Sequence, residues 1–195
     1  MATLALPGGP EGIGGVAKVG PVANELKVPA PEDEARLWSL IEAAWAPLGA
    51  DVRQARQALV TRPAGSPAET SVLMRALPRF LDVLADRGQT LTSAELTCLD
   101  RVVERKLWEI DRASIQAVTG GSDDGFLYAR GFVVAMGREF YDAVVDDPGM
   151  AVPDDECEEM CYFFAQLHQE RFGDFPETGS GISRESGENL IGWLT

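Results

Sequence analysis

Two adjacent acidic side chains stand between glycines in the stretch Gly120–Phe126, which reads GGSDDGF. Paired carboxylates act as acid–base catalysts when burial or mutual repulsion keeps a proton on one of them near neutral pH. Beside a guanidinium group, the same pair can instead bind an amine, a peptide backbone or a divalent ion. The candidate binding residues of this corner are polar and lie within one short segment: Ser122, Asp123, Asp124, Tyr128, Arg130 and Arg138.

The same corner has a purely structural interpretation. Gly120 and Gly121 suit the left-handed backbone that ends many helices, and Ser122 is a favoured N-cap for the helix that follows. Asp123 and Asp124 then fall in the first helical turn, where the helix dipole favours each negative charge by a few tenths to about 1 kcal/mol. Two acids in an exposed first turn do not retain a proton at neutral pH, so we predict no catalytic residues in this corner.

The two arginines of the corner are expected on one helix whose apolar face runs from Phe126 to Val144. Arg130 and Arg138 are then about 80° apart around the axis and roughly 12 Å apart along it, on the side away from that face. Asp124 lies close enough in the chain to form an ion pair with Arg130 across the first two turns. We favour a structural role for this pair over a binding site, and a binding site over catalysis.

A second group of reactive side chains, namely Cys157, Cys161 and His168, falls on one face of the segment ECEEMCYFFAQLHQERF. On a helix, His168 lies roughly 10 Å beyond Cys161, whereas zinc–ligand bonds are only about 2.0–2.3 Å long. The same face carries Met160 and Phe164, so we predict buried cysteines and no metal site. His168 is the only histidine, and no motif positions a nucleophile beside it. An enzyme is therefore not the preferred class, and no cofactor is expected.

The middle of the chain has a helical pattern. A first helix is predicted from Pro31, with acids in its first turn, and Pro47 closely follows its end. Capping boxes are predicted at Ser66–Glu69 and at Thr92–Glu95, each opening another helix. Pro78 lies inside the helix expected after the first box, where it would kink or divide that helix.

The longest periodic segment runs from Leu96 to Val118 and is expected as one helix. Together these patterns predict an all-α fold, a compact multi-helix domain of about five to seven helices over residues 31–175. Residues 1–30, rich in glycine and proline, are expected to form a flexible leader. Residues 176–195 are expected to form an extended acidic tail with a small apolar anchor, which we expect to dock on the domain and which alternatively serves a partner: Leu190, Ile191, Trp193 and Leu194.

The charge of the chain restricts its partners. The 195 residues include 17 basic and 31 acidic side chains, for a net charge of −14. This charge repels phosphate backbones and anionic lipids, so neither nucleic acid nor a membrane is expected, whereas a protein or a basic peptide is. Three cysteines do not indicate a disulfide framework, and neither a signal peptide nor an apolar membrane span is recognisable. We therefore expect a cytoplasmic protein, and the sequence indicates no oligomeric state.

The segments TGGSDDGFLYARGFVVAMGREFYDAVVDDPGMA and ECEEMCYFFAQLHQERFG resemble a bacterial family described as domain of unknown function 4240. The resemblance covers about residues 95–175 and implies an α-helical fold, but it brings no established activity. Two positions depart from the family pattern: the cysteine expected between the glycine pair and the serine is missing, and Gly131 replaces a bulky residue. The positions that carry the pattern are Ser122, Asp123, Asp124, Gly125, Phe126, Tyr128, Arg130, Gly137, Arg138, Glu139, Asp147 and Pro148.

Three classes of function follow from these observations. The preferred class is a protein- or peptide-interaction module, regulatory or immunity-like, because groups that could carry catalysis are scarce. The alternatives are a small-molecule or metal binder, or an enzyme, centred on Asp123, Asp124 and Arg130. An exposed apolar patch beside the acidic surface would favour the first class. A deep pocket reached by both Asp123 and Arg130 would favour the others.

Overall fold

A computed structural model describes residues 26–194, so most of the expected leader lies outside the described residues. Within this range the chain forms nine α-helices and two short 3-10 helices, with no strand. The all-α prediction is confirmed, although the helices outnumber the five to seven expected. Their bounds are α1 Pro31–Trp45, η1 Ala46–Leu48, α2 Ala50–Thr61, α3 Ser71–Gly88, α4 Ser93–Glu109, α5 Ala113–Thr119, α6 Asp123–Ala135, α7 Arg138–Asp146, η2 Pro148–Met150, α8 Glu158–Phe172 and α9 Leu190–Trp193.

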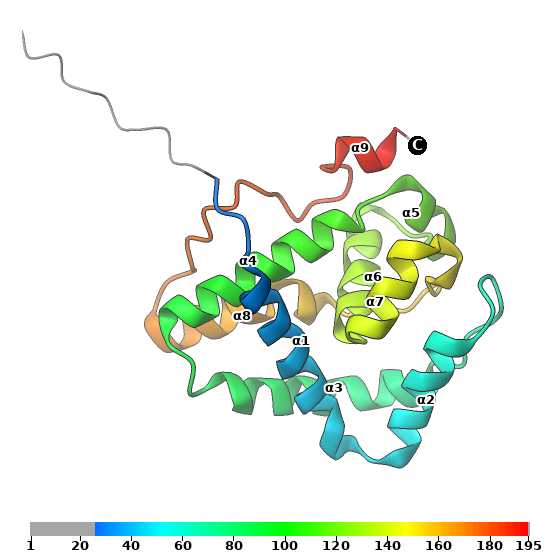
Figure 1. Cartoon of the computed structure of the whole chain (residues 1–195), viewed down its shortest axis with the longest axis horizontal. Coiled ribbons are helices and arrows are strands. Elements are labelled where there is room, and N and C mark those ends of the chain that lie inside the picture. Colours follow the sequence, from blue (N-terminus) through cyan, green and yellow to red (C-terminus); the bar gives the residue numbers. More distant parts are fainter. Residues whose placement is uncertain (1–25, 195) are drawn as a thin grey trace, which may run out of the picture.

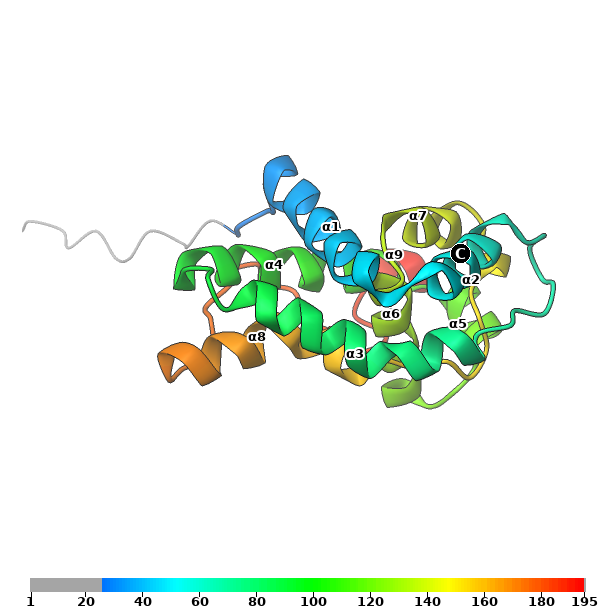
Figure 2. The same cartoon turned by 90° about the horizontal axis from the view of Figure 1, so that it is seen from below.

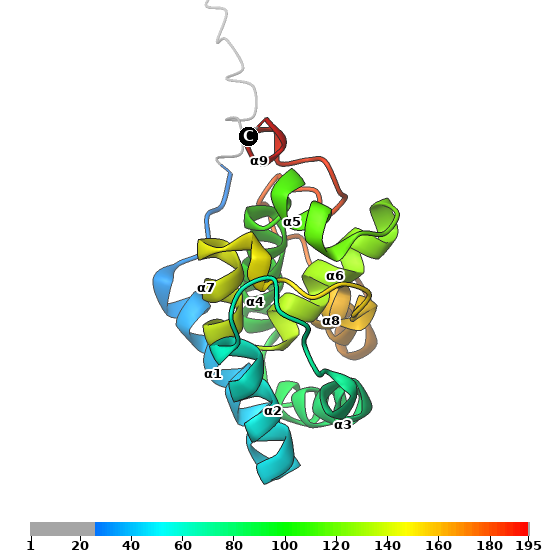
Figure 3. The ribbon, with the colours of Figure 1, turned by 90° about the vertical axis from the view of Figure 1, so that its right-hand side faces the viewer.

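Helix α4 lies at the centre of the molecule, between α1 on one side and α6 and α8 on the other (Figure 1). Seen from below, α3 crosses α1 and α8, and α2 packs beside α3 (Figure 2). Aromatic rings fill the space between these layers, and Trp45 stacks on Phe80 at a centroid distance of 4.3 Å. Turned to its right-hand side, the molecule shows α9 at the end opposite to α2 and α3 (Figure 3). None of the helices within residues 26–194 combines the length and apolar character needed to cross a membrane.

The helix ends confirm some of the predicted caps and correct others. The capping box at Thr92 is formed, because its hydroxyl accepts from the N–H of Glu95 and the Glu95 carboxylate accepts from the N–H of Thr92. The box predicted at Ser66–Glu69 is wrong. Helix α3 begins only at Ser71, whose N–H and hydroxyl both donate to the Glu69 carboxylate. Pro78 does not divide α3, which continues through this exposed residue to Gly88.

Two segments expected as single helices are each divided in two. The segment Leu96–Val118 breaks between α4 and α5, where the chain turns at Asp111. The helix expected from Phe126 to Val144 breaks between α6 and α7 at Gly137, which has a φ of +94°. Apolar periodicity continues across both breaks because each pair of helices packs on the same core, so the pattern alone does not mark them.

Gly131 allows α6 and α8 to approach each other closely. A Cβ atom at this position would meet the carbonyl oxygen of Cys157 and, at 2.6 Å, the sulfur of Cys161. The N–H of Cys157 also donates to the carbonyl of Tyr128, 2.9 Å away, which joins the loop before α8 to α6. Gly131, where the family pattern has a bulky residue, therefore lies at a helix contact that is too close for a side chain.

We expect Gly131→Ala to destabilise the fold. Alanine in a helix normally gains about 0.5–1 kcal/mol over glycine. Here the added methyl group must displace the backbone at Cys157, and overpacking of this kind costs about 1–3 kcal/mol. Urea denaturation should therefore show a lower free energy of unfolding than wild type. An unchanged or raised free energy would contradict the close α6–α8 contact.

The Glu95 cap makes the stability of the protein depend on pH. The N–H of Thr92, together with the Arg36 guanidinium and the Thr92 hydroxyl, lowers the pKa of Glu95 to about 2. The folded-state pKa lies below the unfolded value near 4.5. The contribution of ionised Glu95 to the stability of the fold is therefore fully present at pH values above that unfolded value. It is lost as the pH falls toward 2.

We therefore expect Glu95→Gln to flatten the dependence of unfolding free energy on pH between about 4.5 and 2. Chemical denaturation at a series of pH values measures this slope. If wild type and variant lose stability in parallel over this interval, the depressed pKa of Glu95 is refuted.

Candidate functional site

The Ser-Asp-Asp corner joins α5 to α6, as its structural interpretation predicts. Gly120 and Gly121 have positive φ values of 71° and 92°. The Ser122 hydroxyl accepts a hydrogen bond of 3.2 Å from the N–H of Gly125, so Ser122 is the N-cap of α6. Asp123 and Asp124 occupy the first turn and are exposed. The glycines and the serine therefore build the corner, and the two carboxylates face solvent.

Arg130 is not on the outer side of its helix, contrary to the prediction. Its side chain is fully buried, and the guanidinium lies over the Phe126 ring at 4.9 Å. It donates hydrogen bonds of 3.0 Å to the carbonyl of Leu107, to the carbonyl of Arg184 and to the hydroxyl of Ser186. Burial lowers the pKa of Arg130. Its hydrogen-bond acceptors are all neutral, and the expected Asp124–Arg130 ion pair is not formed.

The remaining candidate residues lie apart from this guanidinium. Arg138 is on α7, where it is exposed and forms an ion pair of 3.3 Å with Asp142. Tyr128 lies half-buried on α6; desolvation and the carboxylates of Glu158 and Asp124 raise its pKa. The six candidate residues therefore do not converge on one site. Asp124 and Tyr128 share a surface with Glu158, whereas Arg130 faces the interior.

Arg130 instead holds the C-terminal strap, by which we mean residues 174–194. This segment leaves α8, runs along α4 and ends in α9 (Figure 1). The Ser186 hydroxyl, which accepts from Arg130, also donates to the carbonyl of Asp123 at 2.7 Å. The corner and the strap are therefore joined through one serine and one buried arginine.

Two carboxylates on α4 hold the middle of the strap. Asp100 and Glu104 accept from the Arg184 guanidinium at 2.7 Å and 3.3 Å, and Glu104 also accepts from the Ser180 hydroxyl at 2.7 Å. Burial raises the pKa of Asp100 against the opposing effect of Arg184. Burial alone would lower the pKa of Arg184, but the two carboxylates raise it. Because these groups are removed from water, each depends on the others for its hydrogen bonds.

A third carboxylate, that of Asp111, holds the end of the strap. It is fully buried and accepts from the N–H groups of Gly187 and Asn189 at 3.1 Å and 2.9 Å, and from the indole of Trp193 at 2.9 Å. The side chain of Asn189 donates to the carbonyl of Trp108 at 2.9 Å. Sequence reasoning missed these roles of Asp100, Glu104 and Asp111, although the helical spacing of the first two beside an apolar stripe was a usable signal.

The apolar anchor predicted in the tail is only partly correct. Trp193 does dock, since its ring meets Phe126 edge-on at a centroid distance of 6.1 Å. Leu190, Ile191 and Leu194 face solvent, with 72%, 75% and 85% of their surface exposed. The strap is therefore attached mainly by buried hydrogen bonds, and it presents large apolar side chains outward.

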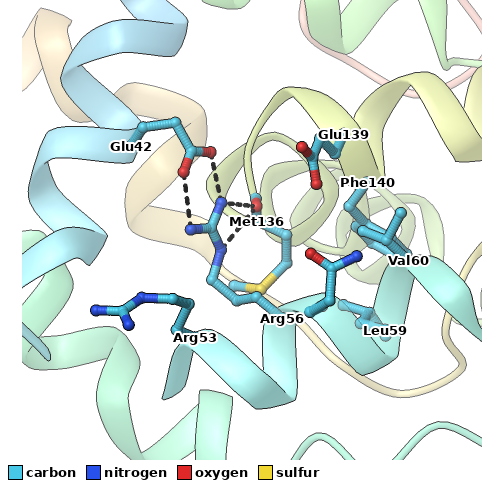
Figure 4. A pocket seen from close by; sticks show the side chains of 9 residues that line it. Glu42, Arg53, Arg56, Leu59, Val60, Met136, Glu139 and Phe140 are labelled. Carbon is cyan, nitrogen blue, oxygen red and sulfur yellow. Dashed lines mark hydrogen bonds and ion pairs between the residues drawn. The ribbon is translucent and has the colours of Figure 1, made fainter. Parts of the chain in front are cut away.

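A second polar cluster lies where α6 ends. Arg56 donates to the carbonyl of Met136 through Nε and Nη2, at 3.1 Å and 2.7 Å, and pairs with both carboxylate oxygens of Glu42 (Figure 4). A Cβ atom on Gly137 would collide with this ion pair. The glycine of the Gly-Arg-Glu motif therefore makes room for an arginine that satisfies the carbonyl of Met136, the residue that caps the end of α6.

A cleft of about 180 Å³ adjoins this ion pair. Arg53 and Glu139 extend along its opposite sides, with the Arg56–Glu42 pair between them (Figure 4). Charges of both signs line the cleft, and Arg56 is already bonded within the protein. The cleft therefore favours neither an anionic nor a cationic ligand, and we assign the cluster a structural role.

Cys157 and Cys161 are buried, as predicted. Burial raises the pKa of both Cys157 and Cys161 to about 12, so the thiols are neutral at physiological pH. Within residues 26–194, no three His, Cys, Asp or Glu side chains are grouped as a metal site requires. His168 is buried and lies within 2.7 Å of the Ser93 hydroxyl, a contact between residues 75 positions apart that sequence reasoning did not anticipate.

The family comparison agrees with the resemblance seen in the sequence. Residues 76–170, from within α3 to near the end of α8, match the model of a family described as Protein of unknown function (DUF4240). This match confirms the resemblance to that family. Among curated proteins and among solved structures, none matches the chain. Arg130 lies inside the matched region, whereas the strap that it holds follows that region.

We expect Arg130→Lys to loosen the strap although the charge is kept. A lysine ammonium lacks the planar fork that reaches Leu107, Arg184 and Ser186 at once. Buried acceptors left without donors cost about 1–3 kcal/mol each, so the unfolding free energy should fall by roughly 2–4 kcal/mol. Hydrogen exchange should also quicken across residues 184–193. The matched control, Arg138→Lys on the surface, should change stability by less than about 0.5 kcal/mol. Equal effects of the two substitutions would contradict the role of Arg130.

Proposed function

We propose that this protein is an interaction module that presents α9 to a protein partner. The observation that carries the proposal is the exposure of three large apolar side chains, those of Leu190, Ile191 and Leu194. Asp111 and Asn189 fix the backbone around them through buried hydrogen bonds. Apolar side chains held in solvent by an ordered framework are typical of protein-binding surfaces.

A groove of about 360 Å³ adjoins these side chains, and it is lined by Trp108, Arg112 and Ile191 among others. The surrounding strap is acidic, with Glu185 and Glu188 exposed. The chain as a whole has a net charge of −14, which is of the same sign. We therefore propose a partner with an apolar pocket bordered by basic residues, since opposite charge speeds association and selects the partner.

The alternative functions, a small-molecule or metal site or an active site at Asp123, Asp124 and Arg130, receive less support. The Arg130 guanidinium is fully buried and occupied by Leu107 and the strap. A ligand held by the exposed carboxylates would not reach it unless the strap moved.

The proposal is tested with the triple variant Leu190→Ser, Ile191→Ser and Leu194→Ser. These side chains are exposed, so thermal stability should stay within a few degrees of wild type, whereas affinity for the partner should fall by about 100-fold or more. The partner is first captured from a host lysate with the wild-type chain, and its affinity for purified variants is then measured by calorimetry.

The matched control removes two other exposed apolar side chains, through Leu26→Ser and Val28→Ser. This variant should retain wild-type affinity. A partner bound equally well by the α9 variant, or binding that does not weaken as salt is raised, would contradict the proposal.

A further inference from the structure

The first residue of α4 and the end of α8 meet at one end of the molecule (Figures 1 and 2). There the Ser93 hydroxyl lies 2.7 Å from Nε2 of His168. The other ring nitrogen, Nδ1, lies 2.7 Å from the carbonyl oxygen of Asp174 and 3.6 Å from its carboxylate. The Ser93 hydroxyl, the His168 ring and the main-chain carbonyl of Asp174 thus form one hydrogen-bonded chain, with the Asp174 carboxylate beside the ring.

The partners of the ring determine its tautomer. A carbonyl oxygen only accepts, so Nδ1 carries the hydrogen and donates it to Asp174. In the neutral imidazole, Nε2 is then the acceptor, and the Ser93 hydroxyl donates to it. A hydroxyl directed at a base whose other ring nitrogen is held by an acceptor is the arrangement of an activated serine nucleophile; here the main-chain carbonyl of Asp174 is that acceptor, and its carboxylate lies nearby.

The N-terminus of α4 adds a site for developing negative charge. The capping box uses the N–H groups of Thr92 and Glu95, whereas those of Ser93 and Ala94 are in the first turn, where a helix provides no acceptor. Such N–H groups, together with the helix dipole, stabilise an oxyanion. Thr92, and not Ser93, caps the helix, and among residues 26–194 the hydrogen-bond partner of the Ser93 hydroxyl is His168.

The elements that carry these groups are held together. Arg171 on α8 donates to the carbonyls of Gly88 and Leu91, in the connection that leads to α4. The methyl groups of Leu167 fill the space over Gly88, where any side chain would collide with them. The distance between Ser93 and His168 is therefore set by two packed helices rather than by a free loop.

Two exposed phenylalanines border the group. The Phe172 ring lies 5.1 Å from the His168 ring and is 44% exposed, and Phe175, next to Asp174, is 57% exposed. An apolar acyl or aryl group of a substrate can rest against such rings. This surface is separate from the exposed side chains of Leu190, Ile191 and Leu194, so the function proposed for α9 does not account for it.

We propose that Ser93, His168 and Asp174 form a hydrolytic site for esters with an apolar acyl group. The Ser93 oxygen attacks the ester carbonyl while its proton passes to Nε2 of His168. The alcohol leaves with that proton as the carbonyl re-forms in an acyl-serine. Water, deprotonated by His168, then releases the carboxylic acid and returns the proton to Ser93. Asp174 is a positioning residue, since it touches the histidine and not the substrate.

The test uses the full chain with p-nitrophenyl butyrate as substrate and a fluorophosphonate as a covalent probe of activated serines. We expect the probe to label Ser93, identified by peptide mass, and Ser93→Ala to lower ester hydrolysis at least about tenfold. Ser71→Ala is the matched control, because Ser71 also begins a helix but bonds to Glu69 and not to a histidine. This control should keep wild-type activity and labelling.

Asp174→Ala tests the positioning role without disturbing the interior, because the Asp174 side chain is 79% exposed. Its main-chain carbonyl remains, so we expect a partial loss, about two- to tenfold in kcat, with KM unchanged. Absence of fluorophosphonate labelling in the wild-type chain would overturn the proposal. So would equal hydrolysis by wild type and Ser93→Ala, with circular dichroism confirming that both are folded.

Discussion

The buried guanidinium of Arg130 is the interaction on which the rest of the structure depends. Transferring a cation into an apolar interior is unfavourable unless its donors find partners. Here those partners come from three places: Leu107 on α4, and Arg184 and Ser186 on the strap. Without the strap, two of the three acceptors would be missing. The α-helical body and the extended C-terminal segment are therefore energetically a single unit.

The strap in turn supplies hydrogen-bond donors to three carboxylates on α4 and just after it. Asp100, Glu104 and Asp111 are carboxylates in positions shielded from water, and their donors are supplied by the strap. Hydrogen bonds to charged groups contribute about 1.5–3 kcal/mol each, more than neutral ones. This network frees the strap from the need to bury its own large side chains, and so Leu190, Ile191 and Leu194 remain available at the surface.

Local signals in the sequence were sufficient for much of the fold. The caps at Thr92 and Ser122, the acids of the first turns and the buried cysteines follow from interactions between neighbours in the chain. The breaks at Asp111 and Gly137 were missed because both halves of each segment keep the same apolar period. Arg130 was placed on the wrong face because its position depends on partners more than 20 residues away. The contact between Ser93 and His168 is likewise visible only once α4 and α8 are packed.

The order in which the polar partners are synthesised has a consequence for how this chain matures in a cell. The ribosome synthesises α4 and α6 before the strap. Asp100, Glu104, Asp111 and Arg130 are therefore already in place when the strap groups that bond to them have still to emerge. During that interval the helices can collapse around their apolar faces, but the polar groups between them keep their water. Final closure of the core must therefore wait until Arg184 through Trp193 have been synthesised and can supply those partners.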